Sequence, residues 1–309
     1  VGNDATQYVY RHTIRTVLER IIGQLLDDRR LDSISITDRG FGDRTWELNE
    51  KTISPSSLDK IVPLQNENGL TYNRCPEFAF RQPFVTAVEE ATLLWPDPIA
   101  LTQTGHVVPE VVHMTNQRRT PRAVTSAVLN SPVAVAKAKF GRTSSENSIR
   151  SIECAAVLQI RWNNYYHWIV EHLAKLRGLE QYEKKTGSTA KIILPEDPAS
   201  YMTQSLEMAG ISSEDWITWP GDQMVVNELV VPSYPELTPG VLKWLQESIL
   251  SSELMDTTSP KRVFVSRQKA KKRRIRNCNS FKSMLEEHGF VTKFMEELSF
   301  EDQVRLVYN

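Results

Sequence analysis

Strand-like apolar runs alternate with amphipathic helices from Ser151 onward, and this alternation limits the folds open to the chain. The pattern predicts strands at 152–160, 191–194, 216–219 and 225–231, with helices at 164–182 and 198–209 between the first three. Strands joined by helices of this length usually form βαβ units with a parallel sheet. The sequence therefore predicts an α/β fold in this part of the chain.

A second α/β series follows a Pro-rich segment that contains Pro232, Pro235 and Pro239. Its predicted elements are a helix at 239–252, a strand at 262–266, a helix at 279–288, a strand at 291–295 and a helix at 299–309. Ser299 and Asp302 are spaced as an N-terminal capping box for the last helix. The two series predict two Rossmann-like units, over 151–235 and from 236 to 309.

Residues 1–150 have a less regular pattern. Apolar residues with helical spacing predict a helix at 7–30, and the polar stretch 31–80 reads as loops with short strands. Short apolar runs between turn signals predict short strands within 84–136, and 137–150 is predicted to be a polar linker. We expect this mixed region to precede the two α/β units.

Composition excludes several classes of protein. The 37 Lys and Arg residues nearly balance the 38 Asp and Glu residues, so bulk charge gives no sign of a nucleic-acid partner. No apolar run approaches the ~20 residues that a membrane span needs, and residues 1–30 lack the apolar core of a signal peptide. Cys75, Cys154 and Cys278 are scattered, which favours a reducing compartment over a disulfide framework. These features predict a cytoplasmic location.

The predicted helix from Asn164 carries the first candidate for chemistry. His167, Glu171 and Lys175 follow one another at four-residue intervals and share one stripe, and Asn164 is a good N-cap. Because ligands of α/β sheets bind where strands end and helices begin, His167 could act as a general base oriented by Glu171. A capped amphipathic helix with a surface histidine is an equally good interpretation. A zinc site with His172 is less favoured, because that residue points off the stripe.

The second candidate is the basic segment 261–277, which has nine basic residues and no acid. It follows a predicted strand and precedes a predicted helix, which Asn277 or Asn279 could cap. Basic side chains beside a helix N-terminus suit a diphosphate. A solvated loop or a small nucleic-acid patch are the alternatives. The chain contains no Walker A loop, no G-x-G-x-x-G and no G-x-S-x-G.

Taken together, these segments resemble glycosyltransferase family 61. The resemblance covers about 150–309 and rests on short motifs in a fixed order. They are N-Y-Y-H-W-I-V-E-H-L-A-K-L at 164–176, I-I-L-P at 192–195, V-F-V-S-R at 263–267, R-R-I-R-N at 273–277, H-G-F at 288–290 and L-S-F-E-D-Q-V at 298–304.

The resemblance implies a GT-B architecture, in which two Rossmann-like domains face each other across a cleft. It implies an inverting transferase that moves a sugar from a nucleotide-diphosphate donor to a glycan or protein acceptor, with no metal and no cofactor. Its expected context is cell-surface polysaccharide or glycoprotein synthesis, at the inner face of the membrane or in peripheral contact with it. By the same resemblance the expected roles are catalytic for His167 and Glu171, donor-binding for Ser266, Arg267, Arg273 and Asn277, and acceptor-side for Asn164 and Lys175.

One departure from the family pattern concerns the C-terminal end. Family members continue past the Gln-containing helix into a strand and an H-G-A-G-like turn, whereas this sequence stops at Asn309. We therefore expect the second domain to be incomplete and the chain to be inactive as it stands. The alternative from another class is a non-catalytic module that docks an anionic partner through its basic loop at 261–276.

Overall fold

The computed structural model describes residues 44–48, 83–94, 98–103, 107–108, 111, 150–158, 164–221, 223–235, 237–250, 260–270 and 272–308. The helix predicted at 7–30, nearly all of the linker predicted at 137–150, and Cys75 lie outside these residues.

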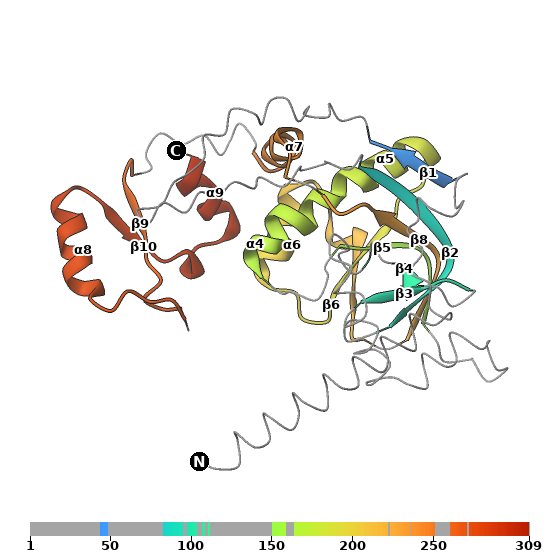
Figure 1. The fold of residues 1–309 in the computed structure, drawn as a ribbon, viewed down its shortest axis with the longest axis horizontal. Helices are drawn as coiled ribbons and strands as arrows, with labels where there is room; N and C mark the ends of the chain where they lie inside the picture. The colour runs from blue at the N-terminus through green and yellow to red at the C-terminus, as the bar shows by residue number, and fades with distance from the viewer. Residues whose placement is uncertain are drawn as a thin grey trace, which may run out of the picture.

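An eight-stranded mixed sheet is the largest element of the described structure (Figure 1). Strands β8, β5, β6 and β7 are parallel neighbours, as the strand–helix alternation predicts. Strands β2, β3 and β4 continue the sheet beyond β8 in antiparallel pairing, and β1 pairs with β2. The strands are β1 (Thr45–Glu47), β2 (Phe84–Leu94), β3 (Ile99–Leu101), β4 (Val107–Val108), β5 (Arg150–Val157), β6 (Lys191–Pro195), β7 (Trp216–Trp219) and β8 (Met224–Pro232).

Helices cover one face of this sheet, and the opposite face has a core of its own. On the second face, apolar side chains from β2 to β8 pack together, including Leu93, Ile193 and Met224. On the first face, helices α5 (Leu176–Thr186), α6 (Ser200–Met208) and α7 (Pro239–Ile249) pack over the sheet. The α/β class predicted from the sequence is confirmed.

The helix that begins after Asn164 is not one regular α-helix, contrary to the prediction for 164–182. One turn of α-helix, α4 (Tyr165–His167), is followed by a π-helix, η4 (Trp168–His172), and a 3-10 turn, η5 (Leu173–Lys175), before α5. Residues 172–176 are all buried, so this segment has no single solvent face. Leu173 and Leu176 share one core with residues of both β6 and α7, so the periodicity of an exposed helix does not apply to this segment.

A small second sheet holds the basic segment. Its parallel strands are β9 (Val263–Val265) and β10 (Val291–Lys293), and α8 (Cys278–Glu287) connects them. The chain then passes through the 3-10 turn η8 (Met295–Glu297) to α9 (Phe300–Tyr308). Ser299 caps α9 as predicted, because its Oγ accepts a hydrogen bond from Asp302 N at 3.1 Å.

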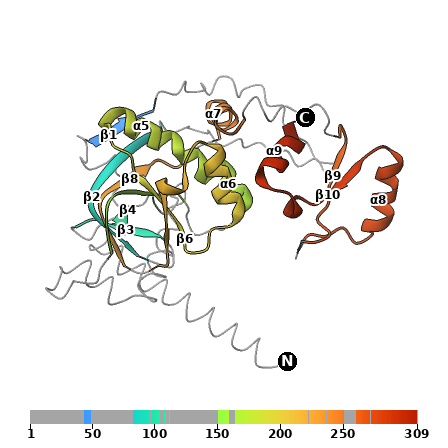
Figure 2. The ribbon, with the colours of Figure 1, turned by 180° about the vertical axis from the view of Figure 1, so that it is seen from behind.

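Helix α9 joins the small sheet to the larger one by packing on α6, and both views show it between α6 and β10 (Figure 2). Phe300 N donates to Gln204 Oε1 at 2.8 Å. The ring of Tyr165, at the start of α4, lies 5.1 Å from that of Tyr201 and 6.4 Å from that of Phe300, between ring centroids. The beginning of the His167 helix therefore lies at the junction of the two α/β parts. Among the described residues, no helix is both long and apolar enough to cross a bilayer.

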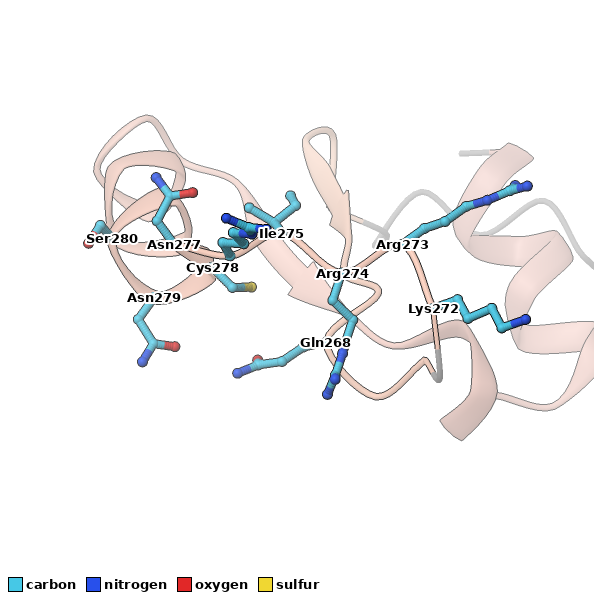
Figure 3. A pocket seen from close by; sticks show the side chains of 10 residues that line it. Gln268, Lys272, Arg273, Arg274, Ile275, Asn277, Cys278, Asn279 and Ser280 are labelled. Carbon is cyan, nitrogen blue, oxygen red and sulfur yellow. The ribbon is translucent and has the colours of Figure 1, made fainter. Parts of the chain in front are cut away.

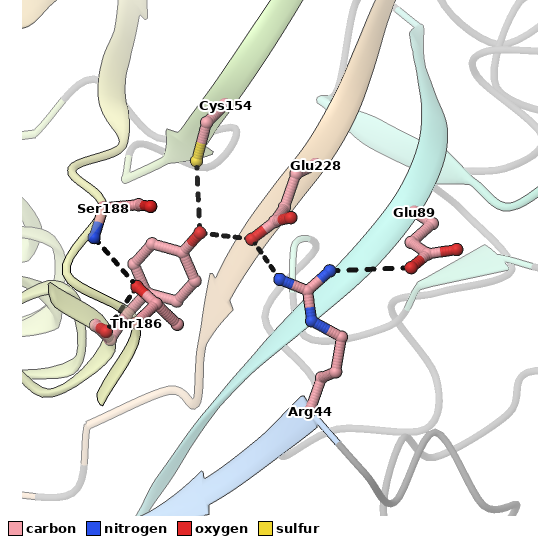
Figure 4. Close-up of polar contacts among 7 residues, drawn as sticks. Arg44, Glu89, Cys154, Thr186, Ser188 and Glu228 are labelled. Carbon is pink, nitrogen blue, oxygen red and sulfur yellow. Dashed lines mark hydrogen bonds and ion pairs between the residues drawn. The ribbon is translucent and has the colours of Figure 1, made fainter.

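A polar network fixes β1 and α5 to the sheet (Figure 4). The hydroxyl of Tyr182 on α5 donates to Glu228 on β8, and Arg44 donates to the same carboxylate at 2.6 Å. Burial and the hydrogen bond to Glu228 raise the pKa of the Tyr182 hydroxyl, while the hydrogen bond from Arg44 to Glu228 raises the pKa of Arg44. The Cys154 thiol lies 3.5 Å from the Tyr182 hydroxyl, and its burial raises its pKa. The network stabilises the fold and lies apart from the candidate site.

Gly178 on α5 lies directly against the end of β8. A Cβ atom at this position would lie 2.6 Å from Pro232 Cβ at the end of β8. We expect Gly178→Ala to lower the free energy of unfolding by about 1–3 kcal/mol, because the helix must move away from the strand. Urea denaturation measures the change. Gly187→Ala is the control, since a Cβ there meets nothing within 4 Å and only its φ of 73° adds strain. A Gly178→Ala variant as stable as the parent chain would show that α5 shifts without cost.

Candidate functional site

The N-terminus of α4 is capped as the sequence predicts. The side chain of Asn164 accepts a hydrogen bond from Tyr166 N at 2.9 Å. The N-cap Asn164 is six positions after Leu158, the last described residue following β5. The capped end therefore lies beyond the carboxyl end of a central parallel strand, where ligands of α/β sheets usually bind.

His167 and Glu171 form a hydrogen-bonded pair one turn into this helix. Nδ1 of His167 lies 2.7 Å from Oε2 of Glu171. Because an ionised carboxylate only accepts, Nδ1 of His167 is the donor in this hydrogen bond. The His167 side chain is 28% exposed and that of Glu171 is 14% exposed. The pair thus has the geometry of a general base with a partly buried orienting partner.

Lys175, the third residue of the predicted stripe, lies in the core. It is 2% exposed, and its Nζ donates to the carbonyl oxygen of Leu158 at 3.0 Å. Burial lowers its pKa to about 8, against the opposing effect of the Glu171 charge. In the structure, Lys175 has almost no surface to offer an acceptor, whereas Asn164 is exposed.

His172 lies beneath the pair rather than beside it. It is fully buried, and its ring packs edge-on against Trp168 with centroids 6.1 Å apart. The indole nitrogen of Trp168 in turn donates to Ser205 Oγ on α6 at 2.8 Å. Within the described ranges, no three His, Cys, Asp or Glu side chains converge as metal ligands would.

Two exposed tyrosines precede His167 in α4, and the ring of one, Tyr166, lies against the imidazole. Tyr165 is 40% exposed and Tyr166 is 55% exposed, and the ring of Tyr166 lies 5.5 Å from the imidazole of His167. Sugar rings have an apolar face, and aromatic side chains commonly line the sites of small ligands. The surface beside His167 therefore suits a ligand with both apolar and hydroxyl groups.

The basic segment forms a pocket of about 670 Å³ around the N-terminus of α8 (Figure 3). That volume is within the usual range for small-ligand sites. Arg273, Arg274 and Arg276 line it, and none of the three makes a hydrogen bond or an ion pair with another described residue; the side chain of Arg273 extends away from Asn277 and Asn279 (Figure 3). The other lining residues are Gln268, Lys272, Ile275, Asn277, Cys278, Asn279 and Ser280.

Of the four residues expected to bind donor, the structure places Arg273 and Asn277 in the pocket and the other two beside it. Ser266 is buried, and its Oγ accepts from Gln268 N at 3.3 Å. Arg267 is exposed and donates to the carbonyl oxygen of Lys272 at 3.5 Å. Ser266 and Arg267 therefore shape the loop in this structure.

Of the two candidate caps for α8, Asn277 and Asn279, the structure has Asn277 at the N-cap position, without a side-chain capping hydrogen bond. The φ of −97° and ψ of 42° at Asn277 differ from the extended conformation of Asn164. The loop also turns through Arg273 with a φ of 60°. Left-handed backbone at a residue other than glycine is strained, and such strain concentrates at ligand sites.

Sequence reasoning missed several contributors to these two regions. Arg274 and Arg276 belong to the basic segment, but the sequence did not show which of its basic residues line the pocket. Lys269 belongs to the same segment, yet it pairs with Glu297, and its Nζ lies 4.8 Å from the centroid of the Phe294 ring. The partner of Trp168 was also missed. A buried indole usually needs an acceptor, and that rule could have directed attention to the serines of the following helix.

The comparisons with known proteins agree with the C-terminal part of this picture. A family model described as Glycosyltransferase 61 matches residues 165–309, a range that contains His167, Glu171 and the whole basic pocket. No curated protein and no solved structure matches the chain. Residues 165–309, a little under half of the chain, are therefore similar to glycosyltransferase family 61.

Proposed function

We propose that the chain, with its neighbouring sequence in place, transfers a sugar from a nucleotide-diphosphate donor to a hydroxyl group of a glycan or protein acceptor. The observation that carries this proposal is the His167–Glu171 hydrogen bond of 2.7 Å at the capped helix N-terminus, within the residues that match the family. Similarity to the family indicates glycosyl transfer, and the site's side chains support the finer assignment.

The proposed reaction is a single displacement with inversion at the anomeric carbon. Nε2 of His167 accepts the proton of the acceptor hydroxyl as its oxygen forms a bond to that carbon. Glu171 accepts the hydrogen bond from Nδ1–H and stabilises the imidazolium that results. The bond from the anomeric carbon to the diphosphate oxygen breaks, and the nucleoside diphosphate leaves with the electron pair.

The basic pocket supplies the positive charge that this leaving group needs. Arg273, Arg274 and Arg276 have unpaired guanidinium groups within the described structure, and each can hold phosphate oxygens with two parallel hydrogen bonds. The N-terminus of α8 adds partial positive charge at the same place. We propose that these groups neutralise the diphosphate in place of a metal ion.

The arrangement of the parts supports a GT-B enzyme in this proposal. Tyr165 precedes His167 by two residues and contacts Phe300 of α9, so the helix of the candidate base begins where the two α/β parts meet. We propose that the acceptor binds on the His167 side, near Asn164 and above Lys175, and the donor on the α8 side. Its proposed setting is cell-surface polysaccharide or glycoprotein synthesis at the cytoplasmic face of the membrane.

Arg273→Ala tests the donor side. We expect the Kd for UDP or GDP, whichever binds the parent chain in calorimetric titration, to rise about tenfold, since a charged hydrogen bond contributes about 1.5–3 kcal/mol. Lys282→Ala is the control, because Lys282 is on α8 but pairs with Glu286 outside the pocket. Equal affinity in Arg273→Ala and the parent chain would contradict the assignment. If neither UDP nor GDP binds and single-stranded RNA binds with steep salt dependence, the docking-module alternative is the better one.

A further inference from the structure

We propose that Gln204 and Phe300 are positioning residues that hold the basic pocket in place relative to the helix of His167. They belong to a joint between α6, α9 and the start of α4, formed by Gln204, Phe300, Tyr165 and Tyr201. This inference rests on the function proposed above, because that reaction takes its base from one α/β part and its diphosphate site from the other.

A side chain of α6 caps α9 from a distant part of the chain. The first N–H groups of a helix have no partner within that helix. Ser299 provides a local cap for Asp302 N, but Phe300 N donates to Gln204 Oε1 at 2.8 Å. Gln204 and Phe300 are 96 positions apart in the sequence. The larger α/β part therefore supplies a hydrogen-bond acceptor that the smaller part does not supply for itself.

The aromatic rings beside this hydrogen bond connect α9 with the helix of the candidate base. Phe300 is 2% exposed, and its ring centroid lies 6.4 Å from that of Tyr165, two residues before His167. The Tyr165 ring in turn lies 5.1 Å from the ring of Tyr201 on α6. A shift of α9 along α6 would therefore change the contacts at the beginning of the His167 helix.

Further contacts hold the basic loop to the same helix. Glu297, in the turn η8 before α9, pairs with Lys269 of the basic segment. On α9, Gln303 Nε2 donates to the carbonyl oxygens of Met295 and Leu298 at 3.0 and 3.1 Å, which holds η8 against the helix. A continuous set of contacts thus runs from the start of α4, through α9 and η8, to the loop that forms the pocket, and Figure 2 shows α9 in this intermediate place.

The proposed transfer depends on this arrangement more strongly than nucleotide binding does. The diphosphate of the donor contacts the basic pocket, whereas the anomeric carbon has to lie beside the acceptor hydroxyl on the His167 side. A displacement of about 1 Å between reacting groups can lower a rate about 10²-fold. Loss of the joint is therefore expected to lower turnover and to leave nucleotide affinity nearly unchanged.

The first test compares Gln204→Leu with Gln204→Glu by hydrogen exchange and mass spectrometry of the full chain. Leucine cannot accept from Phe300 N, whereas a glutamate oxygen can, and its charge is favourable at a helix N-terminus. In Gln204→Leu we expect the amides of α9 to exchange about tenfold faster, while those of α8 and β5 exchange as in the parent chain. In Gln204→Glu the amides of α9 exchange as in the parent chain.

Gln181→Leu is the matched control for the exchange experiment. Gln181 is also a half-buried glutamine on a helix, but its Nε2 donates to the carbonyl oxygen of Glu47 at 3.4 Å, within the larger part. It should leave the exchange of α9 unchanged. Parent-like exchange of α9 in Gln204→Leu overturns the proposal. Faster exchange throughout the chain also overturns it, because Gln204 would then serve general stability.

The second test measures turnover with the identified donor, on the chain with its neighbouring sequence in place. Phe300→Leu is added as a second variant, since it keeps an apolar side chain but loses the ring contact with Tyr165. In Gln204→Leu and Phe300→Leu we expect kcat to fall about tenfold or more, with the Kd for UDP or GDP, whichever binds, within about twofold of the parent value. Gln204→Glu restores kcat.

The outcomes of the two tests separate this inference from the proposed function. Parent-like kcat in both Gln204→Leu and Phe300→Leu overturns the inference and leaves the transferase assignment in place. If the parent chain transfers no sugar, the proposed function fails. The exchange experiment needs no sugar donor, so it still decides whether Gln204 holds α9 in place.

Discussion

His167→Ala lowers the turnover number for acceptor-dependent release of nucleoside diphosphate by about 10³-fold, because the acceptor hydroxyl then has no group to take its proton. The donor affinity changes by less than about twofold, since His167 acts on the acceptor side of the proposed reaction. Steady-state kinetics with the identified donor, on the chain with its neighbouring sequence in place, measures both quantities. Glu171→Gln retains the hydrogen-bond geometry but loses the charge, and we expect a smaller fall of about 10²-fold.

His288→Ala is the matched control for this prediction. His288 follows α8, is exposed, and its Nδ1 lies 2.8 Å from the carbonyl oxygen of Met284. It should leave the turnover number unchanged, because it neither lines the basic pocket nor contacts the His167 helix. Full turnover in His167→Ala would exclude His167 as the base and would leave Glu171 as a structural partner.

Trp168→Ala is expected to have the largest effect on stability, lowering the free energy of unfolding by about 3–5 kcal/mol. The Trp168 side chain is fully buried and belongs to the core between the sheet and helices α6 and α7. Removing the indole leaves a cavity that the surrounding layers fill only in part. Denaturation in guanidinium chloride measures the loss, and a cost below about 1 kcal/mol would contradict the packing described above.

Trp168→Phe separates the volume of the side chain from its hydrogen bond. The ring remains apolar and large, but Ser205 loses the donor at 2.8 Å, so we expect a cost of about 1–2 kcal/mol. Ser205 Oγ still donates to Met202 O at 3.0 Å, which limits the effect. Trp244→Phe is the control, because the Trp244 indole donates to the partly exposed Glu180 and its loss should cost less than about 0.5 kcal/mol.

The elements of the α/β parts could be predicted well from periodicity. β7 occupies the predicted 216–219, and β6, β8 and α6 differ from prediction by two residues at most at either end. β6 and β8 contain runs of consecutive buried residues, and Pro and Gly residues lie close to the ends of these elements. The Asn164 cap was also predictable, since a capping side chain interacts with the main chain only two residues away.

The sheet partners of β2 could not be predicted, because pairing between distant segments leaves no local pattern. β2 is also longer, at 11 residues, than the short strands expected within 84–136. It lies antiparallel to β8, a strand from the other end of the α/β series. Alternating burial indicates that a segment is a strand, but it does not say which neighbour completes its hydrogen bonds.

In the candidate site, spacing predicted the His167–Glu171 contact but not the burial of Lys175. Four-residue intervals place side chains on one side of a regular helix, and a π turn followed by a 3-10 turn changes that relation within a few residues. In the basic segment, composition predicted an anion site but not which cations are unpaired. Lys269 and Arg273 are both basic residues of the same segment. Only the fold shows that Lys269 pairs with Glu297 and that Arg273 lines the pocket.

The pairing of β2 with β8 has a consequence for how the chain reaches its folded state. Phe84 N bonds to Ser233 Oγ, and these two residues are 149 positions apart. At a synthesis rate of about 5–20 residues per second, β2 waits on the order of 10 seconds on the ribosome before β8 is made. During that interval one edge of an 11-residue apolar strand has no native neighbour and is open to pairing with other chains. Slow, non-local folding of this kind lengthens the time during which the nascent chain is exposed to aggregation, which is the hazard that chaperones reduce.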